Sequence, residues 1–117
     1  MDISINEESG ARVVHISGRV DSSTSPQLDQ ALKECFAGDS QSPLVLDFAE
    51  VSFLSSAGLR ILLLAAKAAR QQHLNLAICS LIPPIQEIFE MSGFMGIMDV
   101  HADRQQALTA LAGSKSS

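Results

Sequence analysis

The feature that most constrains the fold is a short apolar run that is followed closely by a long helical pattern. Residues 44–48 read LVLDF, which is typical of a strand covered on both faces. Over residues 56–72, apolar side chains recur at the spacing of an amphipathic helix. A buried strand that leads into a helix is the first half of a crossover between parallel strands. We therefore expect a layered α/β domain.

The rest of the chain alternates in the same way and predicts a single domain over residues 1–113, with a flexible tail over 114–117. We expect a mixed, mostly parallel β-sheet of four to five strands with about four α-helices. The predicted strands are an early edge strand around Ile3 and Ile5 and the segments 11–17, 44–48, 74–79 and 96–100. The predicted helices begin at Pro26 with Thr24 or Ser25 as the cap, span 56–72, run from the prolines at 83–84 to about Gly93, and span 102–113.

In such a sheet, functional sites favour the loops that leave the carboxyl ends of strands. Two loops stand out on this ground. Residues 18–25, GRVDSSTS, follow the first long strand, and residues 51–58, VSFLSSAG, follow the 44–48 strand.

Composition narrows the function classes. With 117 residues and 46 % hydrophobic side chains, the chain can bury one core. Its longest uninterrupted apolar run, 61–66, is far too short to cross a bilayer, so no membrane insertion is expected. The first ten residues lack the basic and apolar blocks of a secretory signal, and a cytoplasmic protein is expected.

The charge balance argues against nucleic acid as a direct partner. Eight Lys and Arg stand against 13 Asp and Glu, which gives a net charge of −5 with no basic cluster. The two cysteines, Cys35 and Cys79, lie in apolar segments and are expected to be buried thiols. Without matching histidine spacing they predict no metal site, and no cofactor is expected.

Motifs for the common catalytic chemistries are absent from the sequence. There is no phosphate-binding glycine loop, no zinc-protease helix motif and no nucleophile elbow. His15, His73 and His101 are isolated in sequence, so no catalytic triad is indicated. Asp47 and Glu50 flank a strand end and are expected to be solvated or to cap neighbouring loops. The chain is therefore not expected to be an enzyme.

The helix expected over 56–72 has two different sides. At about 100° per residue, one side collects Gly58, Leu62, Ala65, Ala66 and Ala69, and the other collects Ser56, Arg60, Leu64, Lys67 and Gln71, with Leu63 at its margin. A face that mixes leucine with arginine and lysine suits protein docking. A solvated helix face is the alternative interpretation.

Ser55 and Ser56 stand where this helix begins. The residues alone favour a helix N-cap role for one of them. Phosphorylation is the alternative, because the helix dipole favours negative charge at this end by about 0.3–1 kcal/mol.

A dense group of methionine and phenylalanine follows near the end of the chain. Its members are Phe89, Met91, Phe94, Met95 and Met98. Core packing is one interpretation, and an adaptable contact surface is the other.

Three segments together resemble one family. The segment LVLDFAEVSFLSSAGLRILL resembles the signature of anti-sigma factor antagonists, the small bacterial members of the STAS domain family. ISGRVDSSTSPQL is similar to the G-x-[LV]-D loop of that family, and IFEMSGF is similar to its late helix end. In order and spacing the three cover nearly the whole chain, and they imply the STAS fold.

The resemblance also implies a site. With Gly58 aligned on the glycine of the family motif, Ser56 takes the position of the phosphorylated serine. Ser55 stands where an acidic residue is usual and is a rival acceptor, and Asp21 matches the aspartate of the earlier loop. The implied partner-binding residues are Asp21, Ser22, Ser23, Ser55, Ser56, Ala57, Arg60, Leu63, Leu64 and Lys67.

The function implied by the resemblance is partner switching. The unphosphorylated protein binds an anti-sigma factor that is also a serine kinase, and the sigma factor is released. Phosphorylation ends the complex, and a PP2C-type phosphatase restores it. ATP belongs to the kinase. Two alternatives remain open: a non-catalytic STAS subunit of a membrane transport system or sensory assembly, and a small enzyme or ligand binder that uses a pocket near Asp21 and Ser56.

Overall fold

The computed structural model describes residues 1–38 and 42–115, with side chains to residue 111. Five strands form one sheet in the order β1-β2-β3-β4-β5, in which β1 is antiparallel to β2 and the other neighbours are parallel. The elements are β1 (Asp2–Glu8), β2 (Ala11–Val20), α1 (Ser25–Ala37), β3 (Leu44–Leu54), α2 (Ser56–Gln71), β4 (Leu76–Cys79), α3 (Pro83–Ser92), the 3-10 helix η1 (Phe94–Gly96), β5 (Asp99–His101) and α4 (Arg104–Lys115). The expected α/β fold with a mixed, mostly parallel sheet is confirmed.

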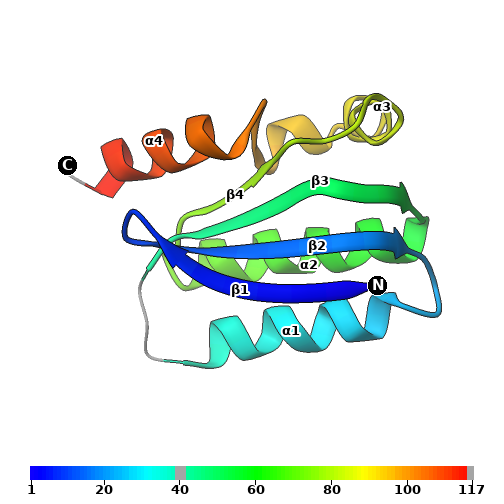
Figure 1. Cartoon of the computed structure of the whole chain (residues 1–117), viewed down its shortest axis with the longest axis horizontal. Helices are drawn as coiled ribbons and strands as arrows, with labels where there is room; N and C mark the ends of the chain where they lie inside the picture. Colours follow the sequence, from blue (N-terminus) through cyan, green and yellow to red (C-terminus); the bar gives the residue numbers. More distant parts are fainter. Residues whose placement is uncertain (39–41, 116–117) are drawn as a thin grey trace.

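The sheet separates two apolar cores. Helices α1 and α2 lie on one side of it and α4 lies on the other (Figure 1). The larger core joins Leu28 of α1 and Leu62 of α2 to Phe48 of the sheet. The smaller core joins Val45 of β3 to Leu108 of α4. Each crossover helix therefore buries its apolar face against the strands that it connects.

Two strands run further than the sequence predicts. The expected strands end at residues 17 and 48, whereas β2 ends at Val20 and β3 at Leu54. Between Asp47 and Phe53, β3 twice uses one more residue than β2 in the pairing, which marks two β-bulges. The bulges move the core-facing side chains of β3 from every second residue to every third. Because the buried residues no longer alternate with exposed ones, the second half of β3 does not match the sequence pattern of a strand.

The N-cap of α1 is Thr24, one of the two expected residues, but its side chain makes no capping hydrogen bond to the helix. Instead, its Oγ1 donates to the carbonyl oxygen of Arg19 at 2.8 Å and accepts from the Asp21 N–H at 2.9 Å. Ser25 is the first helical residue and is buried. The Thr24 hydroxyl therefore bridges the backbone of Arg19 and Asp21 in the turn before α1 and does not bond to the amides of the helix.

One buried carboxylate fixes α4 to the sheet. Asp47 was expected to be solvated or to cap a loop, but it is only 5 % exposed. Its Oδ1 accepts from the Ala49 N–H at 3.0 Å, so the capping alternative holds. Its Oδ2 lies 3.3 Å from His15 Nδ1 and 3.6 Å from Arg104 Nη1. Arg104 also reaches His15 Nε2 at 3.1 Å and Glu8 Oε2 at 3.3 Å.

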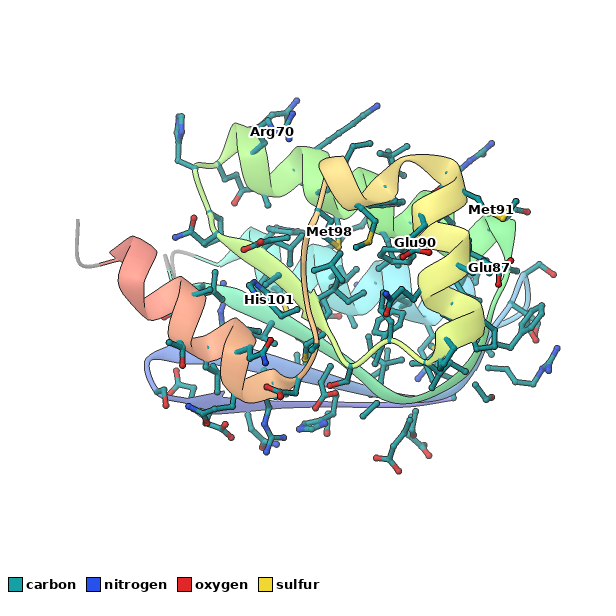
Figure 2. The ribbon with its side chains drawn as sticks, turned by 90° about the horizontal axis from the view of Figure 1, so that it is seen from above. Arg70, Glu87, Glu90, Met91, Met98 and His101 are labelled. Atoms are coloured by element: carbon teal, nitrogen blue, oxygen red, sulfur yellow. The ribbon has the colours of Figure 1, made fainter. Side chains whose placement is uncertain are left out.

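The methionine and phenylalanine group divides between its two interpretations. Phe89 and Phe94 stack with ring centroids 4.9 Å apart, and both are buried with Met98. Met91 is 81 % exposed, and Met95 is also exposed. Figure 2 shows Met98 among the packed elements and Met91 on the outer side of α3. Part of the group is core, and part is surface.

The chain end and the cysteines complete the fold. Helix α4 continues to Lys115, and residues 116–117 of the expected tail lie outside the described residues. The domain boundary at residue 113 stays a prediction. Cys35 and Cys79 are free and buried, as expected. Among the described helices, none is long and apolar enough to span a bilayer.

Candidate functional site

The two loops singled out in the sequence meet at one edge of the sheet. β2 and β3 are parallel, and their last residues, Val20 and Leu54, are paired. One step beyond, the Ser55 N–H donates to the Val20 carbonyl oxygen at 2.8 Å. Figure 1 shows the arrowheads of β2 and β3 ending together beside the start of α2. The loop that carries Asp21 and the start of α2 are therefore held in fixed relation.

Ser55 is the N-cap of α2. Its backbone is extended, with φ −87° and ψ 172°, and its Oγ accepts from the Gly58 N–H at 3.2 Å. Its carbonyl oxygen accepts the first helical hydrogen bond, from the Leu59 N–H at 2.9 Å. The sequence left the cap open between Ser55 and Ser56, and the geometry assigns it to Ser55.

Ser56 is the first residue of α2 and points outward. It is exposed, and within the described part of the chain its hydroxyl has no hydrogen-bond partner. It borders a hollow of about 260 Å³ between α2 and η1. The apolar walls of this hollow are Leu59, Leu63, Phe94 and Ile97, and Arg60 and Ser92 complete it.

Gly58 lets α2 approach the sheet. A Cβ atom at this position would lie 2.7 Å from Leu54 Cδ1, 2.7 Å from Val20 Cγ1 and 3.3 Å from the Val20 carbonyl oxygen. Distances under 3 Å leave no space for a side chain. Glycine is therefore required here by close packing, and its backbone dihedrals demand nothing unusual.

Asp21 organises the neighbouring turn. Its Oδ1 accepts from the Ser23 N–H at 3.0 Å, the Ser23 Oγ at 2.7 Å and the Thr24 N–H at 3.1 Å. These bonds lower the pKa of Asp21, and the hydrogen bond from the Ser23 hydroxyl has the largest effect. The backbone amides of Thr24 and Ser23 lower the pKa further, while partial desolvation of the carboxyl raises it. Its Oδ2 lies 3.8 Å from Arg19 Nε. Ser22 and Ser23 are exposed beside it.

Asp21 and Ser56 share this edge without touching through their side chains. No hydrogen bond joins the two among the described residues, and the Val20–Ser55 hydrogen bond is what brings them together. The Arg19 guanidinium lies over the Phe53 ring, 4.2 Å from its centroid, and extends the same edge. The contact between Arg19 and Phe53 is not predictable from the sequence, because it depends on the second bulge of β3.

The two sides of α2 are as the helical spacing predicts. The five residues of the predicted inner side are all buried, and Ser56, Arg60, Leu64, Lys67 and Gln71 are all exposed. Leu64 is 51 % exposed, which is high for a leucine. Ala57 and Leu63 are half-buried at the margins. The predicted residues on α2 therefore form one continuous surface.

The family match follows the geometry. The STAS domain model matches residues 2–107 of the chain. The chain belongs to the STAS domain family. This STAS domain is 34 % identical over 110 residues to the putative anti-sigma factor antagonist BtrV of Bordetella bronchiseptica, covering 94 % of each chain. It is 28 % identical over 111 residues to the anti-sigma F factor antagonist of Paenibacillus polymyxa, covering 95 % of each.

Solved structures agree on the fold. An anti-sigma factor antagonist from Mycobacterium paratuberculosis superposes on this STAS domain with a TM-score of 0.81 and 28 % identity, covering 95 % of this chain and 93 % of that one. A putative anti-sigma factor antagonist from Thermotoga maritima gives a TM-score of 0.87 at 9 % identity, with 94 % of each chain covered, which shows the shared fold.

The chemistry open to this STAS domain follows from the surroundings of Ser56. In the described part of the chain, no histidine, carboxylate or lysine is hydrogen-bonded to its hydroxyl. A serine nucleophile needs such a base. No group of three or more metal-ligating side chains occurs among the described residues. An exposed hydroxyl at a helix start, on a surface of mixed apolar and cationic residues, is suited to contact and to modification.

Proposed function

We propose that this STAS domain is an anti-sigma factor antagonist that is switched off by phosphorylation of Ser56. It binds an anti-sigma factor through the outer side of α2 and the Asp21 loop, and the sigma factor is released. The anti-sigma factor is also the serine kinase. The observation that carries the proposal is the Ser56 hydroxyl, which is exposed on this surface and makes no hydrogen bond among the described residues. The neighbouring Ser55 hydroxyl, in contrast, accepts a hydrogen bond from the Gly58 N–H as the helix cap.

Phosphorylation is compatible with the position of Ser56 in the fold. In the proposed step, the Ser56 oxygen attacks the γ-phosphorus of ATP on the kinase, the hydroxyl proton passes to a kinase base, and ADP leaves. The product carries about −1.5 to −2 charges at the positive end of α2, where a helix tolerates negative charge. The helix therefore remains intact while its docking surface changes.

The modified surface no longer fits the same partner. A protein that closes tightly over a neutral Ser56 would have to desolvate a bulky dianion. A PP2C-type phosphatase would restore the hydroxyl by hydrolysis, with inorganic phosphate as the second product. Both partners act in the cytoplasm, where we place this chain. It has no catalytic role of its own in this cycle and binds neither nucleic acid nor membrane.

The assignment is tested by mapping the phosphate. The protein is incubated with ATP and an anti-sigma serine kinase of the organism that encodes it, and the product is mapped by mass spectrometry. We expect Ser56→Ala to abolish the phosphate and Ser55→Ala to retain it. A phosphate that persists unchanged in Ser56→Ala would refute the assignment.

Binding is tested separately by calorimetry with the same anti-sigma factor. We expect Ser56→Glu to weaken binding at least tenfold, about 1.4 kcal/mol, and Ser56→Ala to bind nearly as well as the wild type. Equal affinity of wild type and Ser56→Glu would argue against the switch. It would favour the alternative of a non-catalytic subunit in a transport system or sensory assembly, which needs no phosphate-sensitive contact.

A further inference from the structure

Helix α2 carries an unusual concentration of unpaired positive charge. Its three cations, Arg60, Lys67 and Arg70, are exposed, and none of them makes an ion pair among the described residues. Arg60 and Lys67 lie on the outer side of α2 and form a ridge of positive charge, whereas Arg70, labelled in Figure 2, borders a separate hollow with Leu76 and Asp99. The other cations with described side chains all have partners: Arg12 with two backbone carbonyls, Arg19 with Asp21, Lys33 with Asp29, and Arg104 with Glu8 and Asp47.

This ridge of positive charge lies on a chain whose net charge is −5. Helix α2 contains no Asp or Glu, so its own charges are not offset within the helix. A surface that differs in sign from the rest of its molecule favours a partner of opposite charge and orients it during encounter. The complementary partner surface is therefore acidic.

An apolar groove runs beside the ridge. It lies between α1 and α2 and has a volume of about 300 Å³. Lys33 and Asp29 stand on its rim as a neutral ion pair with 3.0 Å between charged atoms. The apolar lining is Leu32, Phe36, Ile61, Leu64, Ala65 and Ala68. The groove has room for one large apolar side chain, and the exposed Leu64 forms part of its wall.

We propose that this α1–α2 groove is a second docking site, separate from Ser56, that receives an apolar side chain flanked by carboxylates. The occupant is a segment of the same anti-sigma partner, so the identity of the partner rests on the function proposed above. The apolar side chain enters the groove, and the carboxylates face the cations of α2. The groove stays available after Ser56 is phosphorylated.

The independence of the two sites follows from their placement on α2. Ser56 borders the hollow on the η1 side, whereas Ile61 and Ala68 border the groove on the α1 side. With a helical rise of 1.5 Å per residue, the midpoint between Ile61 and Ala68 lies about 13 Å along the axis from Ser56. This separation exceeds the Debye length of about 8 Å at physiological salt. A phosphate on Ser56 therefore blocks its own hollow and offsets the charge of Arg60, which lines the same hollow. Lys67 lies about 16 Å along the axis from Ser56, so its charge beside the groove is nearly unaffected.

The groove is tested with two defined peptides and amide chemical shifts of the full-length, ¹⁵N-labelled protein. The acidic probe is the acetylated hexapeptide Glu-Glu-Leu-Phe-Glu-Glu, and the control probe replaces each Glu by Lys. We expect the acidic peptide to shift amides of residues 32–36 and 61–68, and the basic peptide to bind at least tenfold more weakly. No shift in these segments, or equal shifts with both peptides, would overturn the proposal.

Substitutions locate the effect. Ala68→Glu places a carboxylate in the groove and is expected to weaken the acidic peptide at least tenfold, whereas Ala102→Glu, at an exposed position beyond β5, is expected to change it less than twofold. Lys67→Glu reverses one charge of the ridge without filling the groove and is expected to weaken binding too. Unchanged affinity in Ala68→Glu would refute the site.

The switch variant separates this proposal from the previous one. We expect Ser56→Glu to bind the acidic peptide within twofold of wild type, and loss of that binding would overturn the independence of the groove. With the anti-sigma factor, Ala68→Glu should lower affinity by the same factor in the wild-type and Ser56→Glu backgrounds. If Ala68→Glu binds the anti-sigma factor with full affinity, this partner does not occupy the groove. If Ser56→Glu binds the anti-sigma factor as well as the wild type does, the phosphorylation switch is refuted while the groove proposal is not.

Discussion

Gly58 has no space for a side chain, and this contact decides how closely α2 approaches the site. An alanine Cβ would lie 2.7 Å from both Leu54 Cδ1 and Val20 Cγ1. We expect Gly58→Ala to lower the free energy of unfolding by about 1–3 kcal/mol, because overpacking outweighs the gain of about 1 kcal/mol in helix propensity. Urea denaturation measures the change.

A matched glycine provides the control. At Gly96, a Cβ atom would meet no other atom within 4 Å in the described part of the chain. We expect Gly96→Ala to change stability by less than about 0.5 kcal/mol. Equal effects of the two substitutions would show that the close approach at Gly58 is not what requires glycine.

Asp21 makes stability depend on pH. The Ser23 hydroxyl, first among several hydrogen bonds, lowers its pKa from the ordinary value of 3.8. A carboxyl whose folded pKa is lowered stabilises the fold above its unfolded pKa, and this stability is lost as the pH falls through the folded pKa. We expect the difference in unfolding free energy between wild type and Asp21→Asn to be constant above about pH 5 and to shrink below pH 3.8. Denaturation between about pH 6 and pH 2.5 tests this, and a difference that does not vary with pH would contradict it.

Among the elements, α4 is joined to three strands by the side chain of Arg104, in addition to its apolar packing. Arg104 joins this helix to Glu8 of β1, His15 of β2 and Asp47 of β3. Arg104→Met leaves the buried Asp47 carboxylate with His15 and the Ala49 amide, and we expect a loss of about 1–3 kcal/mol. Gln105→Met, an exposed position on the same helix, is the control and should change little.

Hydrogen exchange shows where the loss falls. With Arg104→Met, the amides of α4 should exchange faster relative to those of β2 and β3 than they do in the wild type. A uniform loss of protection throughout the chain would mean that Arg104 supports the whole fold and does not specifically anchor α4.

The elements also show what the sequence can predict. The inner and outer sides of α2 follow from helical spacing alone, since small residues and Leu62 fall on one side. The second half of β3 does not follow, because its bulges replace alternation by a spacing of three, as in Phe48, Val51 and Leu54. Local periodicity is therefore a reliable guide only where the element is regular.

The local features of the site are predictable from the sequence, and its tertiary contacts are not. The outward Ser56 and the loop of Asp21 follow from local pattern and from the family resemblance. The walls of the Ser56 hollow include Phe94 of η1 and Ile97 just after it, which only the tertiary fold brings next to α2. The contacts among His15, Asp47 and Arg104 combine three elements. No local signal in the sequence relates residues that distant.

At the scale of the whole molecule, the two thiols report on global unfolding. Burial raises the pKa of Cys79 to about 11 and raises that of Cys35 as well. At about pH 8, roughly one Cys79 in a thousand would be a thiolate in the folded protein, where the thiol is buried. We expect a disulfide reagent to label both cysteines only through the unfolded state, so the labelling rate should rise with urea in step with unfolding. Rapid labelling of either thiol in native buffer would contradict the burial.

The bulges of β3 also determine how distant relatives of this chain should be aligned. Each bulge adds one residue to β3, and the pairing with β2 resumes beyond it. The number of residues from Leu54 to Gly58 cannot change, because the Ser55 N–H is hydrogen-bonded to Val20 and Gly58 packs against the ends of both strands. An alignment of STAS domains should therefore accept gaps at residues 49–52 and none between residues 54 and 58.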